Sequence, residues 1–580
     1  MCIRDRYNKL KEKLHHFLNT PQQLFWFYIG MNLIPSICLT FTEPFTFMGK
    51  FLLILFPLGF YFILFSSIKN TGLLQLLLFP LLFLHAFQLV LFYLFGEAVI
   101  AVDMFLNIAT TNVSEASELL DNIWPAVVLV CILYIPTTII AAIACKHKVH
   151  TSRTFRRKMI FAGILLLLIT YGLTFCAQNK NTGKFTFKED LYPTNIFYNL
   201  GFAFNKWHKS ENYPETSKDF TFDAQKDIHP GKREIYILVV GEASRAENWS
   251  LNGYERTTTP KLQSTQGLIY YPDAITQSNT THKSVPLILS AASAENYGII
   301  YSQKSILQAF KEAGFTTLFL SNQTPNRSFT DFYAAQANIH HNLRTADHSG
   351  LITANNYDET LLPLVRQYID SLPGDLFFVL HTYGSHFNYK ERYPKSFSHY
   401  TPDNATDVKV QNKSQLINAY DNSILYTDMF LNKLIQTLAE QDACTALFYT
   451  SDHGEDLLDD DRNRFLHSSP NPTFYQLHIP IFLWLSGNYQ TAYPQKTEAA
   501  IENRLKPIAT NSAFHTVLDM AAIRTKYLQP ALSLVNPQFE IAPRMYLNDH
   551  DKPIPFYKAG LKEEDMEMIK KRNLYIFQQE

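Results

Sequence analysis

Five apolar segments in the first 177 residues constrain the fold of this chain more than any other feature. They lie near 23–42, 51–68, 72–96, 123–145 and 158–177, and a helix that crosses a bilayer needs roughly 20 such residues. Buried core helices of a large soluble protein would also be apolar, but five runs in succession with short connections favour membrane spans. A cleavable signal peptide is disfavoured, because four more runs follow the first without a small-residue cleavage site. The sequence therefore predicts a five-helix membrane domain over 1–177.

Charged residues beside the spans predict how this domain crosses the membrane. Lysine and arginine gather at 9–13 and at 146–158, whereas the loop at 97–122 is acidic. Because cytoplasmic loops are enriched in lysine and arginine, we expect both basic segments in the cytoplasm. Five spans then place everything after residue 178 on the far side, which in a bacterium is the periplasm. The first six residues, Met1–Arg6, match nothing that follows and are left out of the fold prediction.

Strand-like and helix-like segments alternate in the second half of the chain. Strand candidates are 234–241, 316–321, 375–381, 445–450 and 479–485, and helical candidates include 303–313 and 414–439. This alternation predicts an α/β domain over 233–580 with a mainly parallel sheet and helices on both faces.

A linker is expected between the two domains, over 178–232. Its segment 190–204 mixes aromatic and polar residues, which suits a helix in the membrane interface, although a loop packed on the soluble domain fits it equally well. Cys444 is the sole cysteine after residue 177, so the soluble domain cannot form an internal disulfide and must rely on its own core.

Metal-type ligands follow three of the predicted strands. Asp452 and His453 follow one, Glu242 follows another, and His381 ends a third, with His386 five residues later. An open α/β sheet carries its chemistry at the carboxyl ends of its strands, and carboxylate oxygen and imidazole nitrogen are natural Zn²⁺ ligands. The pattern predicts a metalloenzyme; the alternatives are that Asp452 and His453 cap a loop and that Glu242 is a surface acid.

Thr281 is the candidate nucleophile, in a polar turn that leads into the apolar segment 287–290. A hydroxyl at a helix N-terminus lies beside unpaired N–H groups that favour an incoming anion such as phosphate. A nearby Zn²⁺ would lower the pKa of that hydroxyl. Taken alone, such a threonine is more often a helix cap; the metal ligands elsewhere favour the nucleophile.

Several short motifs stand out along the chain, namely Val240–Arg245, Ser250–Tyr254, Thr258–Pro260, Asn279–Thr281 with Ser284–Pro286, Gly384–His386, Asn418–Asn422, Ser451–Glu455 with His467, and Leu106–Ile108 with Thr111–Ala116. They resemble those of the membrane-bound phosphoethanolamine transferases of Gram-negative bacteria, within the alkaline phosphatase and sulfatase superfamily. The resemblance runs from the first span to about residue 490, in the family's order. The resemblance implies an alkaline phosphatase/sulfatase-like fold for the soluble domain.

The resemblance implies a zinc centre with a covalent step. Glu242, Thr281, Asp452 and His453 would hold one tightly bound Zn²⁺, and Thr281 would carry phosphoethanolamine in a double displacement. These oxygen and nitrogen ligands make up the usual Zn²⁺ count of four.

Four more residues take substrate roles by the same resemblance. His386 and His467 would bind the substrate phosphate or a second Zn²⁺ and would protonate the leaving group. Asn107 and Glu115 would bind a lipid head group near the membrane surface. The alternatives are ordinary hydrogen-bonded histidines and a solvated loop face.

The resemblance also implies the partners and the location. The donor would be phosphatidylethanolamine, which leaves diacylglycerol, and the acceptor would be lipopolysaccharide, on a core sugar or on lipid A. The protein would be a monomer in the bacterial inner membrane, among its lipids, with its catalytic domain in the periplasm. The net charge of −1 gives no field that would favour nucleic acid. The lipid A branch carries cysteines beside the nucleophile; Gln277 and Leu287 stand there in this chain, and its Asn-Thr-Thr-His form is closer to the core-sugar branch.

Three other functions stay open on the sequence. A phosphoglycerol transferase would use phosphatidylglycerol on the same fold, and a metal-dependent phosphatase or phosphodiesterase would use water as acceptor. A non-enzymatic membrane sensor or scaffold would not depend on Thr281. A formylglycine-type sulfatase is disfavoured, because no Cys-x-Pro-x-Arg motif surrounds Thr281.

Overall fold

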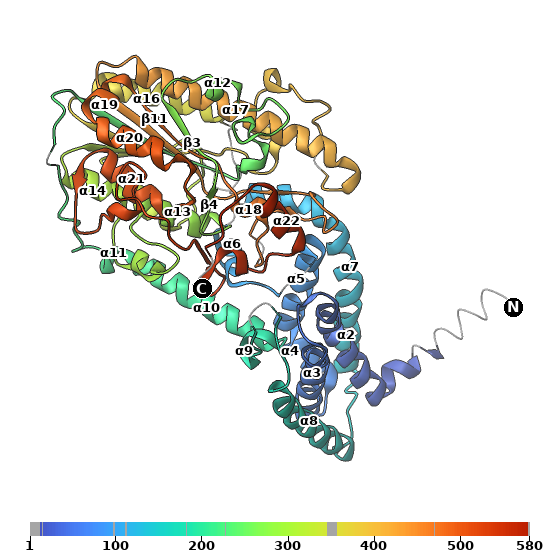
Figure 1. Cartoon of the computed structure of the whole chain (residues 1–580). Helices are drawn as coiled ribbons and strands as arrows, with labels where there is room; N and C mark the ends of the chain where they lie inside the picture. Colours follow the sequence, from blue (N-terminus) through green and yellow to red (C-terminus); the bar gives the residue numbers. More distant parts are fainter. Residues whose placement is uncertain are drawn as a thin grey trace. The chain divides into compact units, whose positions relative to one another are not determined.

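The computed structural model divides into two compact units, 1–105 with 120–203 and 106–119 with 204–580 (Figure 1). The residues that it describes are 12–13, 15–96, 99–110, 113–180, 183–226, 228–344, 356–405, 407–468 and 470–577, without the side chains of 108–121. The N-terminal Met1–Arg6 lies outside these residues. We refer to the two parts as the membrane unit and the catalytic unit.

Long apolar helices make up the membrane unit. The helices up to residue 174 are α2 (Pro21–Thr42), α3 (Phe47–Ser67), α4 (Thr71–Leu77), α5 (Phe79–Phe95), α6 (Val102–Thr110), α7 (Val113–Lys146) and α8 (Arg153–Thr174). Four helical segments are each long and apolar enough to cross a membrane, namely α2, α3, residues 122–146 of α7, and α8. A fifth crossing is possible if α4 and α5 act as one broken span, which agrees with the five predicted spans.

The predicted span over 72–96 consists of two helices. Helices α4 and α5 meet at an angle of 63°. Pro80 lies in the first turn of α5. Proline has no N–H for a hydrogen bond and its ring excludes the preceding helical turn, so it starts a helix more readily than it continues one.

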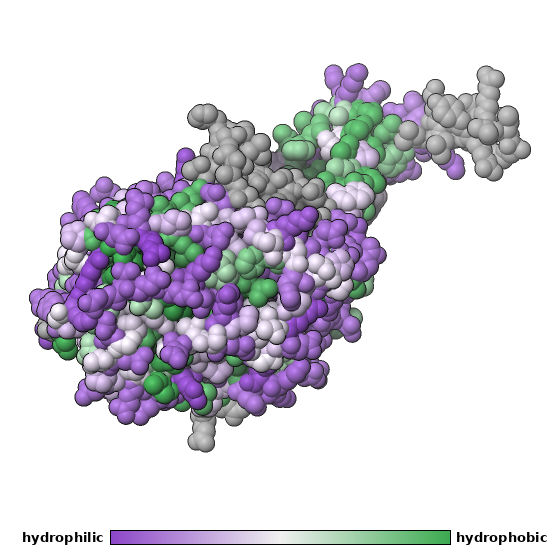
Figure 2. Space-filling view, turned by 90° about the horizontal axis from the view of Figure 1, so that it is seen from above, coloured by the Kyte–Doolittle hydropathy of each residue, from purple (hydrophilic) through white to green (hydrophobic). Residues whose placement is uncertain are grey.

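Helix α8 shows how the membrane unit combines close packing with an outer apolar surface. A Cβ on Gly163 would lie 2.7 Å from the carbonyl oxygen of Gly59 on α3, so the two backbones approach where both lack side chains. Away from that contact, Phe161, Leu168 and Tyr171 are each at least 64% exposed. Figure 2 shows the contrast between this kind of apolar surface and the polar surface that covers most of the catalytic unit. Such a surface is suited to lipid rather than to water.

The linker contains an amphipathic helix. Its helices are α9 (Phe187–Asp190), α10 (Thr194–Glu211) and α11 (Tyr213–Thr216). On α10 the exposed apolar residues Phe197, Leu200, Phe204 and Trp207 are spaced by three or four positions and therefore share one face. The location of this face in the membrane interface stays a prediction.

A seven-stranded sheet forms the centre of the catalytic unit. Its order is β3-β11-β8-β2-β7-β5-β6, with bounds β2 Glu234–Gly241, β3 Leu268–Tyr271, β5 Thr316–Ser321, β6 Ile339–Asn342, β7 Leu376–His381, β8 Cys444–Ser451 and β11 Ile481–Leu485. Strands β8, β2, β7, β5 and β6 run parallel, whereas β11 is antiparallel to both of its neighbours. The predicted α/β class with a mainly parallel sheet is thus confirmed.

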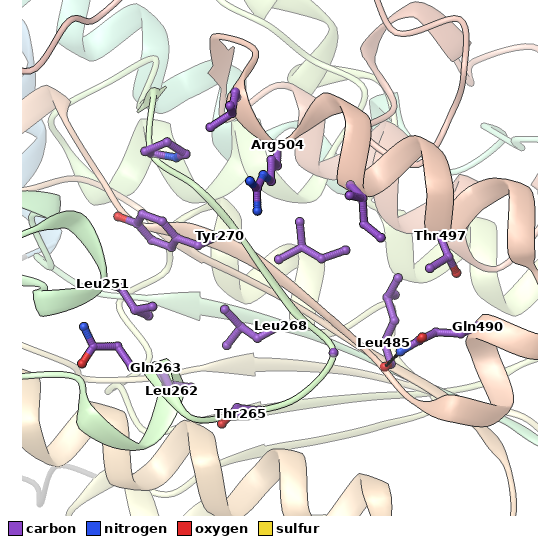
Figure 3. A pocket seen from close by; sticks show the side chains of 15 residues that line it. Leu251, Leu262, Gln263, Thr265, Leu268, Tyr270, Leu485, Gln490, Thr497 and Arg504 are labelled. Atoms are coloured by element: carbon purple, nitrogen blue, oxygen red, sulfur yellow. Dashed lines mark hydrogen bonds between the residues drawn. The ribbon is translucent and has the colours of Figure 1, made fainter.

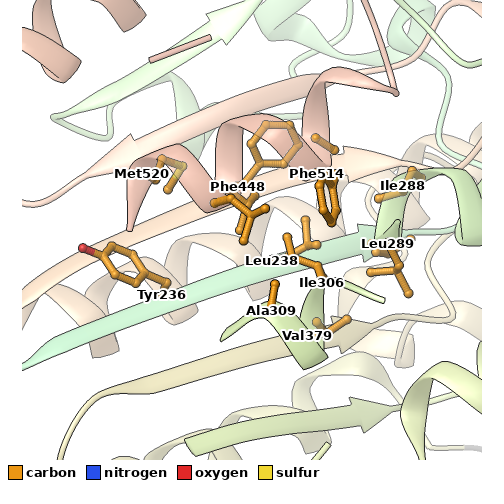
Figure 4. Packing of buried hydrophobic residues seen from close by; sticks show 14 of the residues in the cluster. Tyr236, Leu238, Ile288, Leu289, Ile306, Ala309, Val379, Phe448, Phe514 and Met520 are labelled. Carbon is orange, nitrogen blue, oxygen red and sulfur yellow. The ribbon is translucent and has the colours of Figure 1, made fainter. Parts of the chain in front are cut away.

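Helices cover both faces of the sheet, so its central strands β2, β7 and β8 are buried at every position. On β2, Tyr236 and Leu238 pack with α13 (Thr281–Leu289), α14 (Ile306–Glu312) and α21 (Ser512–Met520) on one face (Figure 4). The alternate residues Ile235 and Ile237 pack with α16 (Leu361–Ser371) and α17 (Lys413–Ala439) on the other. A strand alternates its side chains between faces, so a strand buried on both sides reads as a continuous apolar run.

The remaining elements are short. Two-stranded ladders pair β1 (Gln225–Lys226) with β13 (Ile523–Arg524), β4 (Ala274–Ile275) with β12 (Ile508–Ala509), β9 (Asp456–Leu457) with β10 (Phe465–Leu466), and β14 (Met545–Leu547) with β15 (Pro553–Pro555). The other α-helices are α12 (Pro260–Gln263), α15 (Phe329–Ala334), α18 (Phe474–Leu477), α19 (Gly487–Ala492), α20 (Pro494–Glu502) and α22 (Glu563–Lys571).

Candidate active site and metal centre

Three neighbouring parallel strands deliver the candidate ligands to one edge of the sheet. Strand β2 pairs with β8 up to Gly241 opposite Ser451, and with β7 up to Val240 opposite His381. The next residues, Glu242 from β2 and Asp452 from β8, therefore leave the sheet side by side. All of these positions are buried.

Four side chains converge in the space beyond these strand ends. Thr281 Oγ1 lies 3.3 Å from Glu242 Oε1 and 3.2 Å from His453 Nε2. His453 Nε2 in turn lies 3.3 Å from Glu242 Oε1 and 3.3 Å from Asp452 Oδ2. Ligands bound at 2.0–2.1 Å around a tetrahedral Zn²⁺ lie about 3.3 Å from one another. The spacing and the donor types therefore fit a zinc ion.

The histidine tautomers fit the same conclusion. His453 Nδ1 lies 2.9 Å from the carbonyl oxygen of Gly454, so Nδ1 carries the proton that it donates there, and Nε2 presents its lone pair to the carboxylates. Lone pairs and carboxylate oxygens repel one another unless a cation or a proton lies between them. A ligating histidine is typically held in this way by a hydrogen bond from its other nitrogen.

The pKa values show the same excess of negative charge. Burial, together with the nearby Glu242 carboxylate, raises the pKa of Asp452 to about 7. Burial opposes protonation of His453, but Asp452 and Glu242 outweigh it and raise its pKa to about 10. Burial alone would raise the pKa of Glu242, yet the hydrogen bond and charge of His453 hold it well below its usual value. A divalent cation bound between these groups would supply the positive charge that the two carboxylates favour.

Thr281 is placed to react rather than to cap. It is the first residue of α13, whereas Thr280 is the N-cap residue. Its hydroxyl contacts Glu242 and His453 instead of the N–H groups of its own helix. Ser284, one turn along α13, donates to Asp452 Oδ2 at 3.3 Å and so ties the same helix to a second candidate ligand.

His386 and His467 lie beside this cluster. The ring centroids are 3.9 Å apart for His453 and His467 and 6.2 Å apart for His467 and His386. Within the described part of the chain, Glu242, His453 and His467 form a group whose ligand atoms all lie within 4.8 Å of one another. His386 donates from Nδ1 to the carbonyl oxygen of Phe387, which leaves Nε2 of this ring for a substrate or a metal.

Two residues of the site have no role in the sequence analysis. Glu455 accepts a hydrogen bond from His467 Nδ1 at 2.7 Å and another from the Tyr389 hydroxyl at 2.8 Å. Gln323 donates from Nε2 to Glu242 Oε2 at 3.0 Å. Gln323 follows the end of strand β5, so the strand-end rule that selected Glu242 could also have found it.

Three further residues that the sequence singled out are His381, Asn107 and Glu115. None of them is among the described side chains that converge on Thr281. His381 is buried at the end of β7, where Ser321 Oγ is its neighbour at 3.4 Å, and burial lowers its pKa to about 4. Asn107 lies on α6 in the segment that clusters with the catalytic unit. The side chain of Glu115 lies outside the described residues.

A separate pocket of about 560 Å³ lies beside the edge strand β3 (Figure 3). Its walls include Leu251, Tyr270, Leu485 and Arg504. None of the residues that line it belongs to the cluster around Thr281, so it is not part of the candidate active site.

The site is a buried cluster of carboxylates and a histidine at the strand ends of a mainly parallel sheet. A threonine at the start of a helix lies next to it. These features define a sulfatase-like metalloenzyme, and in this chain it is joined to a helical membrane unit. The sequence profile described as "Sulfatase" matches residues 234–523, which is half of the chain. The profile described as "Phosphoethanolamine transferase EptA/EptB" matches residues 58–204. Phosphoethanolamine transferase EptA of Escherichia coli (strain K12) is 30% identical over 455 residues, which cover 75% of this chain and 80% of that protein. The chain therefore belongs to the phosphoethanolamine transferase EptA/EptC family, and it is a phosphoethanolamine transferase.

Two solved structures show the same fold. The integral membrane EptA of Neisseria meningitidis superposes with a TM-score of 0.67 at 20% identity, over 87% of this chain and 98% of that one. The periplasmic domain of EptC from E. coli in complex with zinc gives a TM-score of 0.53 at 24% identity, over 59% of this chain and 97% of that one. Among the described residues, four helices, or five if the bent pair is one span, are long and apolar enough to cross a membrane. This agrees with the predicted multi-pass membrane domain, and the periplasmic side of the catalytic unit stays a prediction.

Proposed function

We propose that this enzyme transfers phosphoethanolamine from phosphatidylethanolamine to lipopolysaccharide by double displacement through Thr281, with release of diacylglycerol. The observation that carries the proposal is the position of Thr281 Oγ1, which lies 3.2–3.3 Å from both Glu242 and His453. A covalent step lets donor and acceptor use one pocket in turn. The enzyme class itself follows from the family.

Glu242, Asp452, His453 and Thr281 would hold the zinc ion. When bound, Zn²⁺ supplies a Lewis acid that activates the hydroxyl and offsets the charge that gathers on the transferred phosphoryl group. A zinc complex of the related EptC domain supports the choice of metal. We propose one tightly bound ion; a second ion and the substrate phosphate are the two candidates for the place beside His386 and His467.

Side chains of the protein would supply the proton for the leaving group and orient the ring that donates it. Glu455 fixes the ring of His467 through Nδ1, so Nε2 of His467 is the nitrogen that would meet the substrate. We propose that His467 and His386 bind the phosphate and protonate the leaving oxygen. Imidazole suits both roles, because its nitrogens can donate a hydrogen bond to an anion and can pass on a proton.

The membrane side of the reaction is assigned to the linker and to the segment 106–119, which includes the end of α6 and the start of α7. We propose that Asn107 and Glu115 bind a lipid head group, since the segment 106–119 clusters with the catalytic unit. The apolar face of α10 would rest in the membrane interface. We also propose that the membrane domain ends at residue 177, that the linker ends at residue 232, and that the enzyme is a monomer.

The acceptor position is proposed to be a core sugar. The nucleophile segment is flanked by Gln277 and Leu287 rather than by cysteines, and this departs from the lipid A branch. Lipid A is the competing acceptor, because a 30% identical relative is an EptA protein. Mass spectrometry of lipopolysaccharide from cells with and without the enzyme separates the two, since phosphoethanolamine would be found on the core fragment or on the lipid A fragment.

The decisive experiment is the intact mass of the purified protein after incubation with phosphatidylethanolamine, for the wild type and for Thr281→Ala. We expect a gain of one phosphoethanolamine group on the wild type only, and no gain when a zinc chelator is present.

The same experiment distinguishes the alternatives. A gain with phosphatidylglycerol instead would identify a phosphoglycerol transferase. Rapid release of diacylglycerol without any acceptor would indicate a phosphodiesterase. An adduct that persists in Thr281→Ala would exclude Thr281 as the nucleophile.

A further inference from the structure

Ala243, which links the two carboxylate ligands of the proposed zinc site, has an unfavourable backbone conformation. Ala243 follows Glu242 and has φ of +53°, a left-handed conformation that residues with a Cβ avoid. In this conformation its N–H donates to Asp452 Oδ1 at 3.1 Å. One strained residue therefore sets where the chain turns after Glu242 and also holds the carboxylate of Asp452.

A single hydroxyl group ties down both sides of this turn. The Tyr420 hydroxyl donates to the carbonyl oxygen of Ala243 at 2.7 Å and accepts from the N–H of Arg245 at 2.9 Å. Tyr420 lies on α17 and is completely buried. Its ring packs edge-on against Tyr389, with centroids 5.0 Å apart, so the hydroxyl is held rigidly in place.

We propose that Tyr420 is a positioning residue for the metal: its hydroxyl keeps Ala243 in the left-handed conformation, so that Glu242 and Asp452 present their carboxylates to the same ion. The inference rests on the proposed zinc centre. Side chains that orient the ligands of a metal commonly control its affinity although they never touch it.

A purely structural role for Tyr420 makes a different prediction. The ring fills the core beneath the turn, and phenylalanine would fill it as well. If packing were all that Tyr420 contributed, Tyr420→Phe would change stability but leave the affinity for zinc unchanged. If the hydroxyl positions the ligands, the affinity for zinc must fall.

The test is the zinc dissociation constant of the purified full-length protein, measured by competition with a chromophoric chelator. We expect Tyr420→Phe to weaken zinc binding by about tenfold, and added zinc to restore much of the lost transferase activity. The matched control is Tyr426→Phe, a buried tyrosine on the same helix whose ring packs against Tyr357 and Phe397 instead. This control should bind zinc as tightly as the wild type.

A second variant tests the backbone part of the argument. Glycine adopts the left-handed conformation without strain, so Ala243→Gly should make the hydroxyl of Tyr420 less important. We expect the loss of zinc affinity caused by Tyr420→Phe to be smaller in the Ala243→Gly background. If Tyr420→Phe alone folds poorly, the same background removes the backbone strain at position 243 and keeps the measurement possible.

Each outcome decides the inference. An unchanged zinc affinity in Tyr420→Phe, or an equal loss in both backgrounds, would overturn it while leaving the zinc centre intact. If instead Glu242→Gln binds zinc as tightly as the wild type, the proposed centre fails and the role of Tyr420 fails with it.

Discussion

At the scale of single residues, the three histidines of the site share one arrangement. In each of His386, His453 and His467, Nδ1 is engaged by an oxygen of the protein. Each ring therefore keeps Nε2 for a metal or a substrate. For His386 and His453 the partner is a backbone carbonyl, whereas for His467 it is the carboxylate of Glu455, which mutation can remove.

Glu455→Gln is expected to lower kcat/KM by about tenfold, because His467 loses the charged partner that orients its ring. Turnover of phosphatidylethanolamine by the purified enzyme measures the effect. The control is Glu440→Gln, an exposed carboxylate that pairs with exposed Arg366 and that should leave turnover unchanged. Wild-type turnover in Glu455→Gln would contradict the role given to this carboxylate.

Residue types and their place in the chain predicted much of this site, but not its supporting contacts. Glu242, Asp452 and His453 follow recognisable strands, so the rule that chemistry lies at strand ends selected them. Gln323, 81 positions from Glu242, reaches it from another strand. Tyr420, 177 positions from Ala243, reaches it from a helix. The contact of Tyr420 leaves no local pattern in the sequence, whereas Gln323 follows the end of a strand as Glu242 does.

At the scale of elements, an ion pair fastens the end of the short helix α22 to the rest of the catalytic unit. Arg572, the C-cap residue of α22, donates to Glu247 Oε2 at 2.8 Å from Nε. The other carboxylate oxygen, Oε1, lies 3.0 Å from His478 Nδ1. Burial would raise the pKa of Glu247, but His478 and Arg572 outweigh it and lower the pKa below its usual value of 4.5.

Glu247→Gln is expected to destabilise the protein by about 2 kcal/mol at pH 7, which is typical of a hydrogen bond to a charged group. Because the folded-state pKa is lowered, this contribution is complete above pH 4.5 and is lost as the pH falls through the folded value. Urea unfolding of both proteins at pH 7 and at low pH measures the difference. A gap between the two that persists at the lowest pH would contradict this assignment.

Element prediction succeeded where the burial of a strand was visible in its composition. Strands β2, β5, β7 and β8 have mostly apolar sequences, because helices cover both faces of the sheet. The edge strands β3 and β6 have only four residues each, and three of the four residues of β6 are polar. Their pairing depends on the neighbouring strand rather than on their own pattern, so the sequence did not reveal them.

At the scale of the whole molecule, the orientation in the membrane rests on the basic loop 146–158. Reporter fusions test it. An alkaline phosphatase fusion after residue 178 should be active, because that enzyme folds only in the periplasm, and a fusion after residue 149 should be inactive. Replacing the lysines and arginines of the loop by glutamine should reduce the difference between the fusions. Activity at both positions in the unaltered protein would contradict the predicted topology.

The sequence by itself determined the two-part organisation and the kind of chemistry. Membrane helices and strands buried on both faces can be recognised from composition, because lipid or the neighbouring layers favour apolar residues along the whole segment. The tertiary structure alone decided how the site is held. It showed Glu455 behind His467, Gln323 on Glu242, and Tyr420 under the turn at Ala243. These features depend on contacts between distant parts of the chain, and such contacts exist only once the sheet and its helices have packed.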